Sequence, residues 1–399
     1  MLDLLRRIAG NDAVRREPGG MARVTPGTAE VVAGILGIAH DEGWRVAVEG
    51  NGTWRAEDAP ADVVVSLRGL DEIRPNDGSA GTASVDAGVP LERLRRHVLD
   101  DGAWLALDPP GRPDRSLGSI VVTATAGPLR LGFGAVRDQL AAITVATGDG
   151  RVVRTEGDPA GGASDLLGIH VGGFGAFGVV TSCELRLHQL PRADVTWVAT
   201  APRDALTSVG RELAEQGFPM VAAELLSPAL AAEGDWLLAV RLIGERDAVA
   251  DAGPLLAGLG RLTWRELPPD RRSMLWNGAA RAVTTVPVTI RLGVLPDGID
   301  DTIDLIVARL GEGMQSAGVV AGSIRWSGVA DAEPLRAVRA ELAGREIPLT
   351  LERAPWRVRR AVGHFGPYRE RRAATFDRFR HEFDPAGVLV TALDGGQEP

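Results

Sequence analysis

The chain has 399 residues, of which 45% are hydrophobic and 24% charged, enough for two or three globular domains with ample cores. The formal net charge of −9 argues against nucleic acid or an anionic membrane surface as a partner. Every basic residue is an arginine and Cys183 is the only cysteine, which excludes catalytic lysines, disulfides within the chain and cysteine-ligated iron–sulfur clusters.

The first elements form a helix, a strand and a turn. The N-terminal segment MLDLLRRIAG lacks the long apolar region of a secretory signal, and no apolar run approaches the ~20 residues of a membrane span. We therefore expect a cytoplasmic protein without a membrane span. Apolar positions at helical spacing predict a helix over 28–42, and a short strand over 44–50 follows. Strand, turn, strand and an amphipathic helix over 90–99 continue the pattern.

A stretch rich in small residues, 108–181, is the most informative part of the sequence, and its densest portion is 111–138. Glycine is placed where φ is positive or where something large approaches the backbone, and both occur when main-chain N–H groups wrap a phosphate or a flat ring. Two glycine-rich turns then feed strands, the first through an Asp149-Gly150 turn over 141–155 and the second over 172–187. The pattern predicts a cofactor cradle.

Four sequence pieces in a fixed order carry a family resemblance: GNGTW (50–54), LGSIVVTATAGPLRLGFGAVRD (117–138), VATGDGRVVRT (145–155) and DLLGIHVGGFGAFGVVTSCELRLHQLP (165–191). Together they resemble the PCMH-type FAD-binding domain of the vanillyl-alcohol oxidase superfamily. Within it, the chain is most similar to the FAD-binding subunit of bacterial glycolate oxidase. The resemblance covers about residues 24–192 and extends weakly to the end of the chain through FDPAGVL (383–389).

The resemblance implies noncovalent FAD and assigns the residues that would bind it. The matching positions are Gly50, Asn51, Gly52, Thr53 and Trp54 at the pyrophosphate; Pro109, Gly118, Ser119, Thr123, Thr125, Ala126 and Gly127 at the flavin; Arg137 and Asp138 as an anchor of the loop; and Val179 and Val180 at the adenine.

Alternatives remain open at several of these positions. The turn at 50–54 is also compatible with a plain connection between strands, and Glu49 would disfavour a pyrophosphate unless it points away. Arg137 and Asp138 are also compatible with an ordinary surface ion pair. The position that links flavin covalently in some relatives falls on Thr53, which cannot form that bond. His170 lies in an apolar run and is expected to be a core histidine rather than a catalyst.

A proline-containing link at 190–192 predicts a domain boundary. Strands and helices alternate beyond it in two sets, including helices over 202–217, 247–260, 300–316 and 332–344. We therefore expect an α+β protein: a two-subdomain FAD-binding domain of the PCMH type (1–192), a ferredoxin-like antiparallel cap (193–355) and a C-terminal segment that returns to the first domain (356–399).

The cap lacks the residues that usually bind substrate in such proteins. No histidine occurs between His188 and His364, so a histidine-rich metal site cannot be built there. Arg291 and Arg325 are candidates to clamp a carboxylate, although they are also compatible with solvated sheet positions. Tyr368 is the only tyrosine, and no carboxylate is marked as a catalytic base.

We therefore expect a flavoprotein that oxidises a small 2-hydroxy acid by hydride transfer to flavin N5 within a multi-subunit complex. The resemblance implies a larger FAD subunit and an iron–sulfur subunit as partners. The alternatives are a non-catalytic FAD-binding or scaffolding subunit, or a degenerate member that has lost FAD. The missing base favours an accessory role, in which activity appears only with a partner chain.

Overall fold

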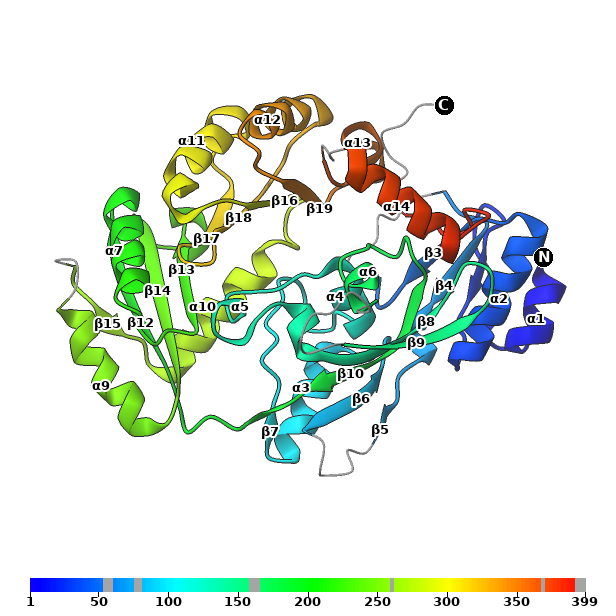
Figure 1. Ribbon diagram of the computed structural model, residues 1–399, viewed down its shortest axis with the longest axis horizontal. Coiled ribbons are helices and arrows are strands. Elements are labelled where there is room, and N and C mark those ends of the chain that lie inside the picture. Colours follow the sequence, from blue (N-terminus) through cyan, green and yellow to red (C-terminus); the bar gives the residue numbers. More distant parts are fainter. Residues whose placement is uncertain (53–59, 75–80, 158–165, 259–261, 367–369, 392–399) are drawn as a thin grey trace.

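The structure is a computed structural model that describes residues 1–52, 60–74, 81–157, 166–258, 262–366 and 370–391 (Figure 1). It has the α+β architecture expected from the sequence. An N-terminal half with two main sheets lies beside a cap built on one eight-stranded sheet. No helix among these residues is long and apolar enough to cross a membrane.

The first sheet has the order β1-β2-β4-β3, with β2 and β3 both parallel to β4. The predicted helix over 28–42 is confirmed as α2, which begins where Thr28 accepts a hydrogen bond from the Val31 N–H and ends at Gly43 in the left-handed region. The elements here are α1 (Leu2–Ala9), β1 (Val14–Arg16), β2 (Ala22–Val24), α2 (Ala29–Glu42), β3 (Val46–Glu49), β4 (Val63–Ser66) and η1 (Leu67–Gly69).

The second sheet is antiparallel, with the order β5-β6-β10-β8-β9. The predicted hairpin is confirmed as β8 and β9, with Gly150 at φ 85° in its turn. The elements are β5 (Ile73–Arg74), β6 (Thr82–Asp86), α3 (Leu91–Asp100), β7 (Ala103–Trp104), α4 (Leu117–Thr123), α5 (Arg130–Phe133), η2 (Val136–Gln139), β8 (Leu140–Ala146), β9 (Val152–Glu156), α6 (Leu167–His170), β10 (Val179–Arg186) and β11 (His188–Gln189).

The cap is two ferredoxin-like units joined edge to edge. Its strand order is β15-β12-β14-β13-β17-β18-β16-β19, so each half repeats one β-α-β-β-α-β pattern and β13 pairs with β17 at the seam. The strands are β12 (Ala193–Ala201), β13 (Ala222–Leu226), β14 (Trp236–Gly244), β15 (Arg265–Glu266), β16 (Val288–Gly293), β17 (Met314–Gly318), β18 (Ser323–Gly328) and β19 (Leu349–Arg353).

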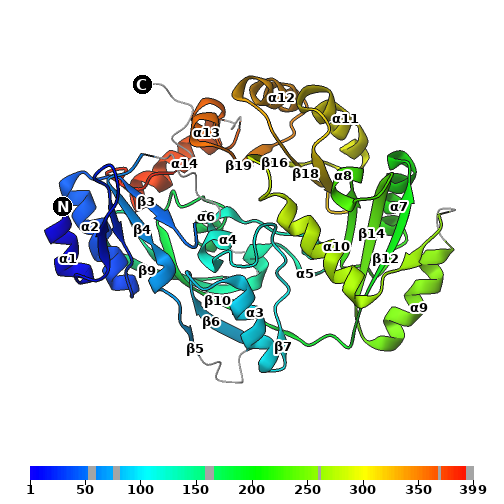
Figure 2. The same cartoon turned by 180° about the vertical axis from the view of Figure 1, so that it is seen from behind.

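Helices cover the two faces of the cap sheet differently. One group lies on the outer face over the larger cap core, whereas α8 and α10 lie on the inner face, with α10 between the sheet and the N-terminal half (Figures 1 and 2). The outer helices are α7 (Arg203–Glu215), α9 (Arg246–Ala257), α11 (Ile299–Leu310) and α12 (Ala332–Gly344), and the inner ones are α8 (Pro228–Ala231) and α10 (Pro269–Ala282); η3 (Pro296–Gly298) precedes α11.

Two local predictions for the cap were wrong. The helix expected over 300–316 ends at Leu310, because Gly311 and Gly313 adopt positive φ, and residues 314–318 form β17 instead. Helix α10 was not predicted at all: none of its residues is fully buried, although Leu275, Trp276 and Ala279 lie at helical spacing and pack on the inner-face core.

The C-terminal segment returns from the cap to the N-terminal half through α13 (Trp356–Val362) and α14 (Glu370–Phe383). The Val46 N–H donates to the Val388 carbonyl at 2.8 Å, and the Val390 N–H donates to the Val46 carbonyl at 2.9 Å. Val388 and Leu389 lie in the same hydrophobic core as the two N-terminal sheets. The predicted boundaries at 192 and 355 stay predictions, although strands β12 to β19 all fall between them.

Candidate active site between the two halves

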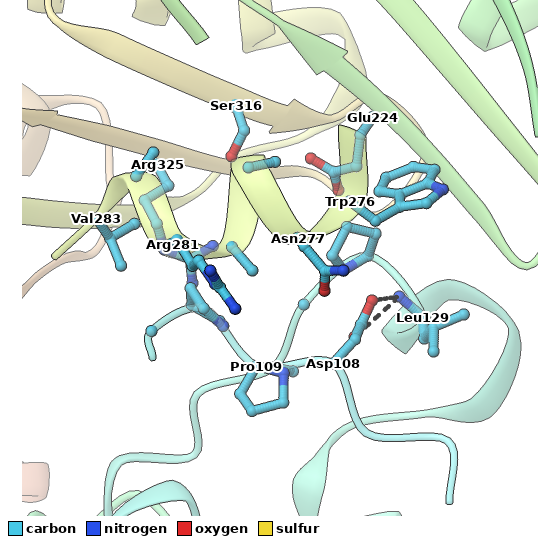
Figure 3. A pocket seen from close by; sticks show the side chains of 18 of the residues that line it. Asp108, Pro109, Leu129, Glu224, Trp276, Asn277, Arg281, Val283, Ser316 and Arg325 are labelled. Carbon is cyan, nitrogen blue, oxygen red and sulfur yellow. Dashed lines mark hydrogen bonds between the residues drawn. The ribbon is translucent and has the colours of Figure 1, made fainter. Parts of the chain in front are cut away.

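A cavity of about 280 Å³ lies between the N-terminal half and the inner face of the cap. Residues Asp108, Pro109, Ala126, Gly127 and Leu129 form what we call the N-terminal wall, and Glu224, Arg291, Ser316 and Arg325 form the cap wall. In Figure 3, Glu224, Ser316 and Arg325 project from the cap sheet toward the loop that carries Asp108 and Pro109.

The two arginines predicted as carboxylate ligands both line this cavity, and the strand register places them side by side. Arg291 on β16 is the direct cross-strand partner of Arg325 on β18, which in turn is opposite Ser316 on β17. Glu352, 1% exposed, lies behind them. Arg325 donates two hydrogen bonds to its carboxylate, at 2.8 and 3.1 Å, and Arg291 Nε forms an ion pair with it at 2.8 Å without the alignment of a hydrogen bond.

This cluster is cationic overall. Burial alone would raise the pKa of Glu352, but the charges of Arg325 and Arg291 and the hydrogen bonds from Arg325 outweigh it, so the pKa lies below its ordinary value. One carboxylate therefore faces two guanidinium groups and leaves an excess positive charge at the cavity. Such a site suits a small anion, because a planar guanidinium binds a carboxylate through paired hydrogen bonds.

Two carboxyl groups with raised pKa also line the cavity, and the sequence marked neither. Burial raises the pKa of Glu224 to about 8, with Arg325 lowering it and Asp108 raising it. Burial likewise raises the pKa of Asp108 to about 6, although its oxygens accept the Leu129 N–H and Arg241 and Arg95 lie near. Groups of this kind in a cavity are candidates for proton transfer.

Helix α10 closes the cavity at one side. Trp276 on α10 donates from its indole N–H to Thr196 Oγ1 at 3.0 Å. Arg241 lies over the Trp276 ring at 5.8 Å and forms a paired contact with Asp194 at 2.8 and 2.9 Å. The adjacent prolines at 268 and 269 are a helix-start signal that could have predicted this element.

Arg115, 1% exposed, organises the glycine-rich stretch from within, and sequence reasoning missed it. Its guanidinium donates to Ser119, to the Pro110 carbonyl, and to the hydroxyls of Thr123 and Thr125, at 2.7 to 3.2 Å. Burial lowers the pKa of Arg115 to about 9, so it remains charged at neutral pH. The hydroxyls that the sequence predicted at the flavin thus have a partner within the chain.

Three of the predicted cofactor glycines are packed against protein. A Cβ on Gly127 would lie 1.9 Å from the Asp108 carbonyl, one on Gly118 would lie 2.8 Å from the Ala87 Cβ, and one on Gly50 would lie 1.8 Å from Ser116 Oγ. At these positions glycine is required because two chain segments meet closely. Pro109, Ala126 and Gly127 also line the cavity.

The turn at 50–52 has features that fit a bound cofactor. The buried Ser116 hydroxyl beside Gly50 has no hydrogen-bond partner among the described residues, and Gly52 has φ 73° with open space where a Cβ would be. Asn51 donates from its side chain to the Asp114 carbonyl at 2.5 Å, which holds the turn in place. An unused hydroxyl and an open turn are what a pyrophosphate needs. Thr53 and Trp54 lie outside the described residues.

The residues predicted at the adenine and as the loop anchor lie in β10 and η2. Val179 and Val180 pair with β8, but β6 pairs with β10 only from Ser182 onward, which leaves the other edge of the two valines without a strand partner in the described chain. Asp138 accepts the Ala135 N–H at 2.8 Å and closes the loop after the glycine turn. Arg137 precedes it in the same short helix, η2.

Two charged or titratable residues have partners away from the cofactor. Glu49 forms an ion pair with Arg23, which also holds Glu17, so its carboxylate is compensated. His170 is 4% exposed, stacks edge-on with Phe383, and has its pKa lowered to about 4 by burial. It is a core histidine, as expected.

Residues 21–156 match a family model described as an FAD binding domain. A probable mitochondrial D-lactate dehydrogenase of Danio rerio is 26% identical over 213 residues, 51% of this chain and 42% of that protein. A D-2-hydroxyglutarate dehydrogenase of Xanthomonas citri is 27% identical (50% and 44%), and the glycolate oxidase subunit GlcE of Escherichia coli is 29% identical (43% and 47%). The chain spans less than half the length of each of these relatives.

Solved structures share the fold over nearly the whole chain. p-Cresol methylhydroxylase with substrate bound superposes with a TM-score of 0.78 at 14% identity, covering 99% of this chain and 96% of that one. Alkyldihydroxyacetonephosphate synthase gives 0.68 at 12% identity, over 92% and 76%. The predicted fold, a PCMH-type domain followed by an antiparallel α+β cap, is confirmed by these structures, and residues 21–156 carry the match to the FAD binding domain.

Proposed function

We propose that the protein is an FAD-dependent oxidoreductase that oxidises a small 2-hydroxy acid in the cavity between the two halves. The observation that carries the proposal is the pair Arg291 and Arg325, which share the single carboxylate of Glu352 on the wall facing the FAD-binding domain. The names of the relatives, D-lactate and D-2-hydroxyglutarate dehydrogenases and a glycolate oxidase subunit, support the same substrate class.

The residues of the chain would bind and orient the substrate. Arg325, held rigid by its two hydrogen bonds to Glu352, would clamp the substrate carboxylate, and Arg291 beside it would neutralise the remaining charge. Noncovalent FAD would be held by the turn at 50–52, the Ser116 hydroxyl and the edge of β10 at 179–180. Bound FAD supplies the acceptor for the α-hydrogen, which leaves as a hydride toward flavin N5.

The alternative is a subunit that binds FAD without catalysis, acting as a scaffold in a complex with a larger FAD subunit and an iron–sulfur subunit. The similarity to GlcE, itself described as a subunit, favours an assembly of several chains. We propose that this assembly is cytoplasmic. The charged cavity favours a reaction in this chain, because two partly buried arginines and two buried carboxyls of raised pKa are costly to keep in a scaffold.

Anaerobic mixing tests the proposal. Purified protein loaded with FAD is mixed with D-lactate, glycolate or D-2-hydroxyglutarate, and we expect at least one of them to bleach the flavin absorbance. The variant Arg325→Met should lower kcat/KM by roughly 10- to 100-fold, the worth of a charge-assisted hydrogen bond. The control Arg309→Met alters an exposed arginine on the outer face and should not change the rate. FAD that stays oxidised with all three acids would favour the non-catalytic alternative.

A further inference from the structure

We propose that Glu224 accepts the hydroxyl proton of the substrate. This rests on the proposed function and adds the proton acceptor that it lacks. Glu224 is 8% exposed, lies on the cap wall, and has no hydrogen bond or ion pair to any described residue. A buried carboxyl with free oxygens that faces a cavity is available to a ligand, since every other charged group on the cap wall already has a partner.

The strand register sets the distance between Glu224 and the arginine clamp. Glu224 on β13 is opposite Gly318 on β17, whose neighbour on β18 is Ser323, while Arg325 is opposite Ser316. Adjacent strands are about 4.8 Å apart, so the two backbones are roughly 10 Å apart across the sheet and two residues apart along it. Small residues fill the space between them, and Glu224 Oε1 lies only 3.1 Å from where a Cβ of Gly318 would be. A molecule of a few atoms can therefore touch both side chains.

The chemistry of a 2-hydroxy acid suits this spacing. Its hydroxyl is on the carbon next to the carboxylate, so a carboxylate held by Arg325 presents the hydroxyl to the side of the clamp where Glu224 lies. In the oxidation, the O–H bond breaks and its proton passes to the Glu224 carboxylate. The C–H electron pair leaves as a hydride to the bound FAD, and the carbon–oxygen double bond of the oxo acid forms.

Groups from each surrounding element set the titration of Glu224. Arg325 on β18 favours its ionised form, and Asp108 on the N-terminal wall opposes it. Arg241 on β14 also lines the cavity but is paired with Asp194, and Arg272 on α10 lies 3.8 Å from the same carboxylate. β17 contributes only Ser316 and Gly318 beside Glu224. Glu224 thus titrates near pH 8, in the range where a base is effective.

Asp108 is a weaker candidate for the same role. Both of its oxygens face the Leu129 N–H, at 3.0 and 3.3 Å, and its carbonyl packs on Gly127. Its carboxylate is therefore a positioning group for the glycine-rich loop. Its charge also opposes ionisation of Glu224, so removing that charge should lower the pH at which Glu224 titrates.

The first experiment follows flavin reduction by the best of the three hydroxy acids at pH 6 to 10 by anaerobic stopped flow. For the wild type, we expect the rate to rise about tenfold per pH unit and to level off above about pH 8, because only the ionised base is active. Glu224→Gln should be slower by roughly 10²- to 10⁴-fold and independent of pH. The matched control, Glu266→Gln at an exposed position on β15, should keep the wild-type profile. In Asp108→Asn the profile should shift to lower pH.

The second experiment needs no turnover. Oxalate, a small dicarboxylate without a hydroxyl, is titrated calorimetrically at pH 8 in buffers of different ionisation enthalpy. Its charge should drive Glu224 to take up about half a proton in the wild type, and Glu224→Gln should take up none. If Glu224→Gln keeps both the wild-type pH dependence of flavin reduction and the proton uptake on oxalate binding, the proposal is overturned. If the pH dependence is lost only in Asp108→Asn, the role belongs to Asp108. Flavin that no hydroxy acid reduces in the wild type would instead refute the proposed function.

Discussion

The two walls of the cavity are lined by different kinds of residue. Around Gly127, the N-terminal wall consists of backbone, proline and small or apolar side chains, with Asp108 as its one carboxylate; Arg95, Arg112, Arg130 and Trp104 line the cavity from the same half. The cap wall consists of long charged side chains on neighbouring strands, with Arg291, Arg325 and Glu352 in direct contact. The first wall can accept a large flat group closely, whereas the second can hold charge and move protons.

This difference suggests separate roles for the two halves of the molecule. Close packing leaves the N-terminal wall little freedom to change, because Gly127 and Asp108 already touch. The cap wall can change its chemistry by exchanging side chains on a fixed sheet. Substrate selectivity should therefore depend on the cap and cofactor binding on the N-terminal half.

The largest effect is expected from Gly127→Val. The sequence alone suggests that this change removes FAD by filling its space, but the new Cβ would lie 1.9 Å from the Asp108 carbonyl. We expect the free energy of unfolding to fall by roughly 4 kcal/mol or more, because two backbones would be forced apart. Urea denaturation of the FAD-free protein measures it. A variant of normal stability that only fails to take up FAD would show that the glycine serves the cofactor directly.

The next effect concerns the cap wall. Glu352→Gln leaves the partly buried Arg291 and Arg325 side by side without their shared, buried carboxylate. We expect a loss of about 3 to 5 kcal/mol in the free energy of unfolding, the usual cost of breaking a buried ion pair. Glu341→Gln, which changes an exposed partner of Arg309, is the control and should cost less than about 1 kcal/mol. Equal losses in both variants would mean that the cluster is solvated.

A third prediction uses pH to distinguish Glu224 from Glu352. The folded pKa of Glu224 is about 8 against 4.5 for the unfolded chain, so the folded state binds the extra proton between these values. Stability should therefore fall as pH rises from about 4.5 to 8, by about 3 kcal/mol after allowance for water in the cavity. In Glu224→Gln the share of this loss that extends up to pH 8 should disappear, and only the smaller loss from Asp108, whose pKa is raised to about 6, should remain. The pKa of Glu352 is lowered, so its stabilisation is present above pH 4.5 and is lost as pH falls through the folded value. Urea denaturation across the pH range measures both effects: the loss of stability at rising pH from Glu224 and the loss at falling pH from Glu352.

The smallest effect is expected from Gly52→Ala. Gly52 has φ 73°, where an L-residue is strained, but no atom of the described residues lies within 4 Å of the position that the new methyl group would take. We expect a cost of about 1 kcal/mol from the backbone alone. Thermal unfolding measures it, and Gly43→Ala, at φ 70° with equally open surroundings, is the matched control. If Gly52→Ala weakens FAD binding while Gly43→Ala does not, the turn at 50–52 contacts the cofactor.

The N-terminal half could be predicted from sequence because its signals are local. The Asp149-Gly150 turn fixes the β8–β9 hairpin within a few residues, and Thr28 and Gly43 mark the ends of α2. Such features need no knowledge of the rest of the chain. The order of the glycine-rich pieces then led to the correct fold.

The cap site could be predicted only in part. Arg291 and Arg325 were identified as the only kind of cation the cap could offer, but Glu352 joins them through strand pairing that the sequence does not display. Glu224 acquires its raised pKa from burial, against the lowering effect of Arg325 two strands away. Arg115 was missed because its partners are hydroxyls and carbonyls, which leave no charge pattern.

The contacts that join the two halves include backbone hydrogen bonds. The Gly111 N–H donates to the Ala280 carbonyl on α10 at 2.7 Å, and the Gly132 N–H donates to the Val221 carbonyl at the start of β13 at 3.1 Å. A Cβ on Gly132 would lie 2.7 Å from the Val221 side chain, so the two segments meet without a gap.

The Gly111 amide proton can exchange with deuterium only when its contact with α10 opens. The Gly132 N–H also donates to the Leu129 carbonyl at 3.2 Å, so its exchange requires that this bond opens together with the contact to Val221. Their exchange rates therefore report how often the cavity opens fully, one amide beside α10 and the other beside β13. A substitution that loosens the contact between the halves should speed exchange at both amides if the cap moves as one body, and at Gly111 alone if α10 opens on its own. Hydrogen exchange at these glycine amides thus measures how often the cavity opens to a substrate, and the measurement needs neither flavin nor turnover.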